Sequence, residues 1–191
     1  MHVTDAIILK KEGAGEADLL ITALTPNFVR IRLVAQGARK VGAKLKGHLE
    51  PFSLSRLSFV AGRNNYRLIG AELQNFFPKI KSEPERLRIA SEIGNILDSA
   101  LFEDVAPGGG GFFELTHDAL SFLDNPSRSL ADCSKALLWF RAQFLKESGL
   151  LPEGLMPEAA HSVGFVGLVE RTKLAELEEE VSRVFNAYLM G

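Results

Sequence analysis

The sequence predicts an α+β fold in which an amino-terminal β-barrel is followed by an all-α helical domain. Two observations predict it. Short apolar runs separated by turn signals fill residues 5–73, whereas apolar residues recur every three or four positions from residue 82 onward. Pro78 marks the change of pattern. We therefore expect a barrel domain over residues 1–80 and a helical domain over residues 81–191.

The first domain is expected to contain five strands, over residues 5–11, 17–24, 29–35, 52–60 and 66–73. Thr25-Pro26-Asn27 predicts a turn in which Pro26 sets φ and Asn27 tolerates a positive φ. Residues 36–50 are expected to form a glycine-containing loop, and residues 61–65 a hairpin connection. Five short strands dispose of their edges by closure, so the five-stranded oligonucleotide/oligosaccharide-binding barrel (OB fold) is expected, with a small sandwich as the alternative.

The second domain is expected to contain four helices. Ser82 and Glu85 have the spacing of a capping box that begins the first of them. An apolar stripe continues that helix to Leu101, and the others are expected over residues 112–123, 129–148 and 168–189, with an irregular stretch over residues 149–166. The third helix is apolar nearly all round, so we expect it at the centre of the helical domain.

Positive charge is concentrated in the first domain. Residues 1–81 carry 13 Lys or Arg against 6 Asp or Glu, and residues 82–191 carry 9 against 18, in a chain of net charge −2. Between Arg30 and Arg67 nine basic residues stand against one acid, Glu50. Such a field steers polyanions to one part of the surface, so a nucleic acid is the expected partner class, and a merely solvated barrel surface is the alternative.

The strand over residues 29–35 alternates between apolar and other residues, which places Arg30 and Arg32 together on its exposed face. Arginine binds phosphate bidentately, and an exposed aromatic ring such as Tyr66 offers a stacking platform for an unpaired base. The candidate DNA-binding residues are Arg30, Arg32, Arg39, Lys40, Lys44, Lys46, Arg56, Arg63, Tyr66 and Arg67.

The sequence has no recognisable catalytic motif. Its four histidines are scattered, and the glycines at 108–111 are not followed by the Lys and Ser or Thr of a phosphate loop. Cys133 is the only cysteine, which excludes an intramolecular disulfide and a multi-cysteine zinc site, and it is expected to be buried. We therefore expect a binding protein that uses no metal or cofactor, rather than an enzyme.

The chain also lacks the features of a membrane or secreted protein. It has no run of about 18 or more apolar residues, and no signal-peptide pattern precedes the first expected strand. A cytoplasmic protein with no membrane partner is the expectation.

Several short motifs follow one another in a fixed order in the first domain. They are Gly15-Glu16-Ala17-Asp18-Leu19-Leu20, Val34-Ala35-Gln36-Gly37-Ala38-Arg39-Lys40, Leu49-Glu50-Pro51-Phe52, Gly62-Arg63 and Ala71-Glu72-Leu73. Over roughly residues 5–80 this ordered set resembles the RecO family of recombination mediators. In the helical part only the layout is similar, with residues 147–153 resembling the end of the family's long central helix.

The resemblance implies an OB barrel followed by a helical domain, binding to single- and double-stranded DNA, annealing of complementary strands, and loading of the recombinase RecA in DNA repair. It implies RecR and the acidic tail of single-stranded DNA-binding protein as partners, a nucleoid-associated location, and Arg39 and Lys40 as foremost DNA contacts. For the tail, the candidate contacts are Lys135 and Arg141. An RNA-binding or protein-docking OB module is the alternative.

The sequence departs from the family pattern in three places. Many relatives carry a cysteine cluster for zinc in the helical domain, where this chain has Cys133 alone. The chain is expected to be a short form with an abbreviated helical domain. Phe28 and Val29 stand where the family tends to have glycine, which leaves Asn27 to make the turn.

Overall fold

The computed structural model describes residues 1–43, 45–62, 65–101, 110–150 and 171–190. The chain divides into two compact units. The barrel unit comprises residues 1–77 and 94–114, and the helical unit comprises residues 78–93 and 115–191.

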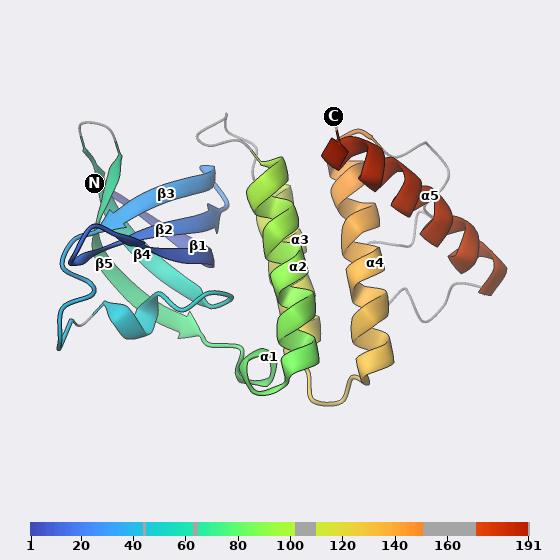
Figure 1. The fold of residues 1–191 in the computed structure, drawn as a ribbon, viewed down its shortest axis with the longest axis horizontal. Coiled ribbons are helices and arrows are strands. Elements are labelled where there is room, and N and C mark those ends of the chain that lie inside the picture. Colours follow the sequence, from blue (N-terminus) through green and yellow to red (C-terminus); the bar gives the residue numbers. More distant parts are fainter. Residues whose placement is uncertain (44, 63–64, 102–109, 151–170, 191) are drawn as a thin grey trace. The chain divides into compact units, whose positions relative to one another are not determined.

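The barrel unit is built on five strands that close on themselves (Figure 1). The strands are β1 (His2–Ala14), β2 (Asp18–Thr25), β3 (Val29–Ala35), β4 (Leu54–Ala61) and β5 (Tyr66–Asn75). Their order around the barrel is β1-β2-β3-β5-β4, and a short parallel pairing of β3 with β5 at Leu33–Tyr66 and Val34–Arg67 closes it. The predicted fold class, a five-stranded OB-type barrel followed by helices, is confirmed.

Alternate strand residues fill the interior of the barrel. The fully buried core includes Ile8, Ile21, Ile31 and Phe59 from four different strands. Because successive strand side chains point to opposite faces, the residues between these point to the outside of the barrel. The loop predicted over residues 36–50 contains one turn of 3₁₀-helix, η1 (Lys46–His48).

The turn between β2 and β3 differs from the prediction. Asn27 is expected from the sequence to make this turn, but the residue with a positive φ is Val29, with φ 53°. A β-branched residue is strained in this region, and only a surrounding structure that fixes it can hold it there. Val29 is buried and paired with Thr25, whose hydroxyl accepts the N–H of Phe28 at 3.0 Å.

In the described part of the chain the barrel is followed by the helices α1 (Pro78–Ser82), α2 (Pro84–Ala100), α3 (Gly110–Asp124), α4 (Leu130–Glu147) and α5 (Arg171–Met190). α4 packs against α5 and buries Trp139, Phe140 and Phe144, in agreement with its apolar sequence. Gly149, with φ 69°, follows the end of α4. Apart from residues 149 and 150, the irregular stretch predicted up to residue 166 lies outside the described residues.

The predicted capping box at Ser82 and Glu85 is wrong. Ser82 is the last residue of α1, and its hydroxyl donates to the carbonyl of Lys79 at 3.3 Å. Glu85 instead forms an ion pair with Arg88 at 2.7 Å. A capping box does begin α4, where Ser129 and Asp132 bond to each other's backbone N–H groups.

Candidate nucleic-acid interface

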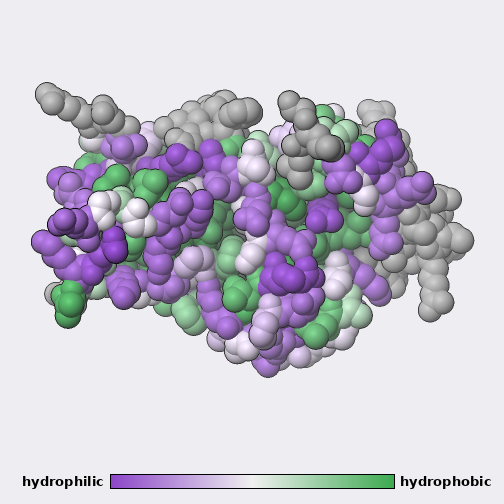
Figure 2. Space-filling view, in the orientation of Figure 1, coloured by the Kyte–Doolittle hydropathy of each residue, from purple (hydrophilic) through white to green (hydrophobic). Residues whose placement is uncertain are grey.

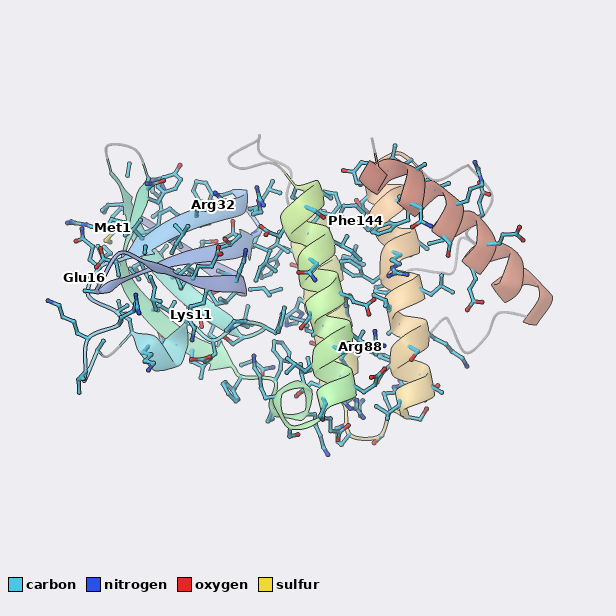
Figure 3. The ribbon with its side chains drawn as sticks, in the orientation of Figure 1. Met1, Lys11, Glu16, Arg32, Arg88 and Phe144 are labelled. Atoms are coloured by element: carbon cyan, nitrogen blue, oxygen red, sulfur yellow. The ribbon has the colours of Figure 1, made fainter. Side chains whose placement is uncertain are left out.

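Two of the predicted arginines lie on the outer face of neighbouring strands. Val34 of β3 stands opposite Arg67 of β5, and Arg32 is the next outward residue on β3. Both arginines are exposed; Figure 3 labels Arg32 on β3, and Figure 2 shows hydrophilic side chains over much of the visible face of the barrel unit. Their register brings two guanidinium groups to one side of the barrel.

The turn after β3 holds Arg39 in a defined position. Gly37 has φ 66° and donates its N–H to the carboxylate of Asp18 at 2.8 Å. The backbone N–H of Arg39 donates to the carbonyl of Ala17 at 2.9 Å, and its guanidinium donates to the carbonyl of Gly15 at 2.8 Å. Among the described residues this guanidinium bonds to a backbone carbonyl and to no carboxylate. Its charge is therefore exposed and not neutralised at close range.

Two further lysines lie beyond this turn. Lys40 follows Arg39 and is exposed, and so is Lys46, which begins η1. Lys44 and Arg63, which the sequence also predicts as contacts, lie outside the described residues. Asp18, at the start of β2, accepts the N–H of Gly37 in this turn. The described cations thus follow β3 and the turn after it.

The prediction that Arg30 lies exposed beside Arg32 is wrong. Arg30 is only 9% exposed, and its guanidinium lies 2.6 Å from the carboxylate of Asp98 and also bonds to the carbonyl of that residue. Asp98 belongs to the part of α2 that lies within the barrel unit. Ile7 and Leu24, which also point outward, are fully buried. Alternation predicts an exposed face only where solvent reaches it, and this part of the barrel is covered.

Arg56 is exposed, but its charge is balanced by neighbouring acids. On the outer face of the barrel it stands between Asp5 of β1 and Glu72 of β5. Its Nε lies 2.9 Å from the carboxylate of Asp5, which also accepts a bond from Gln74 at 3.0 Å. The hydrogen bond and the charge of Asp5 raise the pKa of Arg56. Lys11 is similarly paired with Glu50 at 2.6 Å.

Tyr66 is half-buried and does not project from the barrel as a free platform. Its ring centroid lies 5.2 Å from that of Phe59, which is fully buried, and 6.3 Å from those of His2 and Phe28. Tyr66 therefore belongs to a group of rings at the end of the barrel. The structure thus brings Arg32, Arg39, Lys40 and Arg67 to the β3 side and leaves Arg30 and Arg56 in ion pairs.

The barrel is similar in sequence to a domain of a known protein family. Residues 1–77 match the family model described as "Recombination protein O N terminal". Over these residues the chain is similar to the amino-terminal domain of RecO proteins. The predicted resemblance to RecO is thereby confirmed.

Three relatives show how far the similarity to RecO extends. DNA repair protein RecO of Roseiflexus sp. (strain RS-1) is 37% identical over 104 residues, 54% of this chain and 36% of the relative. The RecO proteins of Desulforamulus reducens (30% over 153 residues) and of Dehalococcoides mccartyi strain 195 (31% over 151 residues) cover 80% and 78% of this chain and 57% of each relative. The chain thus spans between about a third and somewhat over half the length of these RecO proteins.

The two residues predicted to hold an acidic partner tail, Lys135 and Arg141, lie on α4. Lys135 is half-buried. The guanidinium of Arg141 lies 3.2 Å from the carboxylate of Glu92 and stands over the ring of Phe185, 5.4 Å from its centroid. The two positions are six residues apart, which is about 120° around a helix. They therefore do not project from one face.

The described residues contain neither a group of metal ligands nor a helix that could cross a membrane. Among the described residues, no three His, Cys, Asp or Glu side chains are grouped in a way that holds a metal ion. Within the same residues, no helix has the length and apolar character needed to cross a membrane. Cys133 is buried, as predicted, and burial raises the pKa of its thiol.

Proposed function

We propose that this chain acts as a DNA-binding recombination mediator of the RecO kind, which binds single- and double-stranded DNA, anneals complementary strands and helps to load recombinase. One observation supports the proposal above the others. Arg39 is exposed, its guanidinium is oriented by the carbonyl of Gly15, and Lys40, Arg32 and Arg67 lie on the same strand system. Its relatives are named DNA repair proteins, which agrees with this role.

The proposed surface suits annealing because it contacts phosphates without reading bases. Guanidinium groups bind phosphate oxygens in pairs, and phosphate contacts carry no sequence information. A guanidinium already held by Gly15 loses less freedom on binding than a mobile one. The proposed contacts are Arg32, Arg39, Lys40, Lys46 and Arg67, together with Lys44 and Arg63. Arg30 and Arg56 are left out because Asp98 and Asp5 hold them.

We also propose that the helical unit has a non-catalytic role, which is to bind protein partners. Its partners in this role are the acidic tail of single-stranded DNA-binding protein and RecR, which load recombinase together with the barrel. Lys135 is the first proposed contact for the tail. Arg141 is second, since Glu92 already binds its guanidinium.

The experiment that tests the proposed function is a charge reversal at Arg39 and Lys40. Binding of labelled oligonucleotides is measured by fluorescence anisotropy at 50 and 200 mM salt. If four phosphates are neutralised, wild-type affinity falls about 50-fold for single strands and about 150-fold for duplex over this range. The double variant Arg39→Glu with Lys40→Glu is expected to bind more than tenfold more weakly and to show a smaller salt slope.

Arg56→Glu is the control, because it reverses the charge of an exposed strand arginine of the same barrel, one reversal against the two of the double variant. Asp5 and Glu72 already balance Arg56, so this variant is expected to bind DNA far more tightly than the double variant. Salt-independent binding, or equal losses in the control and the double variant, contradicts the proposal. A clear preference for RNA over DNA oligonucleotides at equal salt favours the RNA-binding alternative instead.

A further inference from the structure

Four aromatic rings meet at one end of the barrel. They belong to His2 of β1, Phe28 of the β2–β3 turn, Phe59 of β4 and Tyr66 of β5, and their centroids lie 5.2 to 6.3 Å apart. Phe59 is fully buried and Phe28 and Tyr66 are half-buried, whereas His2 is exposed. His2 is therefore the ring of this cluster that solvent reaches most.

The other three rings hold the imidazole of His2 from one side. Its plane lies over the ring of Phe59 with centroids 5.2 Å apart and an interplanar angle of 28°. Phe28 and Tyr66 meet it edge-on, at 82° and 81°. These contacts fix the orientation of the imidazole and cover one of its faces. Because His2 is exposed, solvent reaches part of the residue that these three rings do not cover.

Positive charge flanks this ring cluster. Tyr66 pairs with Leu33 in the parallel β3–β5 ladder. Arg67 follows Tyr66 and Arg32 precedes Leu33, and both arginines are exposed on the outer face. Neighbouring strand residues point to opposite faces, so the rings close the barrel end while the arginines lie just outside it. A nucleic-acid strand bound through its phosphates to these arginines passes beside the ring of His2.

We propose that the face of the His2 imidazole away from Phe59 is a stacking site for one unpaired nucleobase, next to phosphate contacts at Arg32 and Arg67. The site rests on the proposed function, because the strand must first be held by its phosphates. A base inside a duplex is already stacked on both faces, so only an unpaired base can lie on this ring. The site therefore adds affinity for single-stranded DNA and none for duplex.

The test compares His2→Ala with wild type in the full chain, using a labelled single-stranded oligonucleotide and a duplex of equal length. Loss of one stacking partner is expected to weaken single-strand binding by roughly tenfold and to leave duplex binding unchanged. His2→Phe keeps a stacking ring and is expected to bind like wild type. Val3→Ala is the control, because Val3 is the next residue of β1, exposed on the outer face, and is expected to change neither affinity.

A second measurement uses the wild-type chain and a strand in which the central nucleotides lack their bases. This strand keeps its phosphates but offers no base to stack. Wild type is therefore expected to bind it more weakly than the intact strand, and wild type and His2→Ala are expected to bind it with the same affinity. Equal affinity of wild type for intact and abasic strands overturns the stacking site, as does an equal loss of single-strand and duplex binding in His2→Ala. If DNA binding still depends on salt in either case, the proposed function stands.

Discussion

Arg39 of the barrel unit is exposed and donates from its guanidinium to the carbonyl of Gly15, whereas Arg86 of the helical unit is 3% exposed and donates to five acceptors. The acceptors of Arg86 are the carboxylate of Glu83, the carbonyls of Leu123, Asn125 and Arg128, and the sulfur of Cys133, at 2.5 to 3.3 Å. The same side chain thus serves as a surface charge in one unit and as an internal connector in the other.

The difference follows from the cost of burying a charge. A guanidinium removed from water is tolerated only when its donors find acceptors, and Arg86 finds them at the end of α3 and in the turn that follows. Once these bonds are made, the guanidinium of Arg86 is held inside the helical unit. Arg39 is bonded at one donor only among the described residues, which leaves the rest of its fork for a phosphate. Burial and bonding thus distinguish Arg86 from Arg39, which is one of the proposed DNA contacts.

The largest expected effect is the loss of Arg86. Arg86→Ala leaves the buried carbonyl of Leu123 without its donor and breaks the ion pair with Glu83, and we expect it to lower the free energy of unfolding by about 3–5 kcal/mol. Urea denaturation followed by circular dichroism measures this change. Arg88→Ala, in the same helix at an exposed position, is the control and is expected to change stability little. If both variants lose equally little, Arg86 does not connect the helices of this unit.

Arg30 tests whether burial alone decides the role of an arginine in the barrel unit. Arg30→Met removes the ion pair with Asp98, and we expect a loss of about 2 kcal/mol in the free energy of unfolding and little change in DNA affinity. Arg32→Met, at the next outward position of the same strand, is expected to weaken DNA binding and to change the free energy of unfolding little. Thermal unfolding and oligonucleotide anisotropy on both variants measure the two effects. If Arg30→Met loses DNA binding while its stability is unchanged, the proposed division between buried arginines that stabilise the fold and exposed arginines that bind DNA is contradicted.

This contrast also marks what the sequence can predict. Period-two alternation and turn signals depend on neighbouring residues, and they located all five strands and the barrel. The burial of Arg30 depends on Asp98, 68 residues further along the chain, and no local pattern contains that information. The resemblance named Arg39 and Lys40 as DNA contacts, and both residues are exposed, but the contact with DNA stays a prediction.

The two serines predicted or found to begin helices show the same limit of prediction from local sequence. Ser82 and Ser129 are both followed three residues later by an acid, and only Ser129 forms the capping box. Near Ser82 the carboxylate of Asp124 accepts the backbone N–H groups of Lys79 and Ile80, at 2.7 and 3.2 Å, and so caps a short helix that begins earlier. A tertiary cap replaces a local one here, and propensity cannot foresee it.

The smallest expected effect concerns the capping box that begins α4. Ser129→Ala removes the hydroxyl that accepts the N–H of Asp132 and is expected to cost about 1 kcal/mol of stability. Ser134→Ala, whose hydroxyl donates to the Leu130 carbonyl inside the helix, is the control and is expected to cost less. Urea denaturation at neutral pH separates the two variants.

The same box predicts an acid dependence. Hydrogen bonds from the Ser129 hydroxyl and backbone N–H lower the pKa of Asp132 below its ordinary value. A carboxylate with a lowered folded-state pKa stabilises the fold above its ordinary pKa of about 3.9, and this contribution is lost as pH falls through the folded-state pKa. Wild type is therefore expected to lose more stability than Asp132→Asn between pH 5 and pH 2, as read from urea midpoints. Parallel losses in the two proteins mean that the Asp132 carboxylate does not contribute to the start of α4.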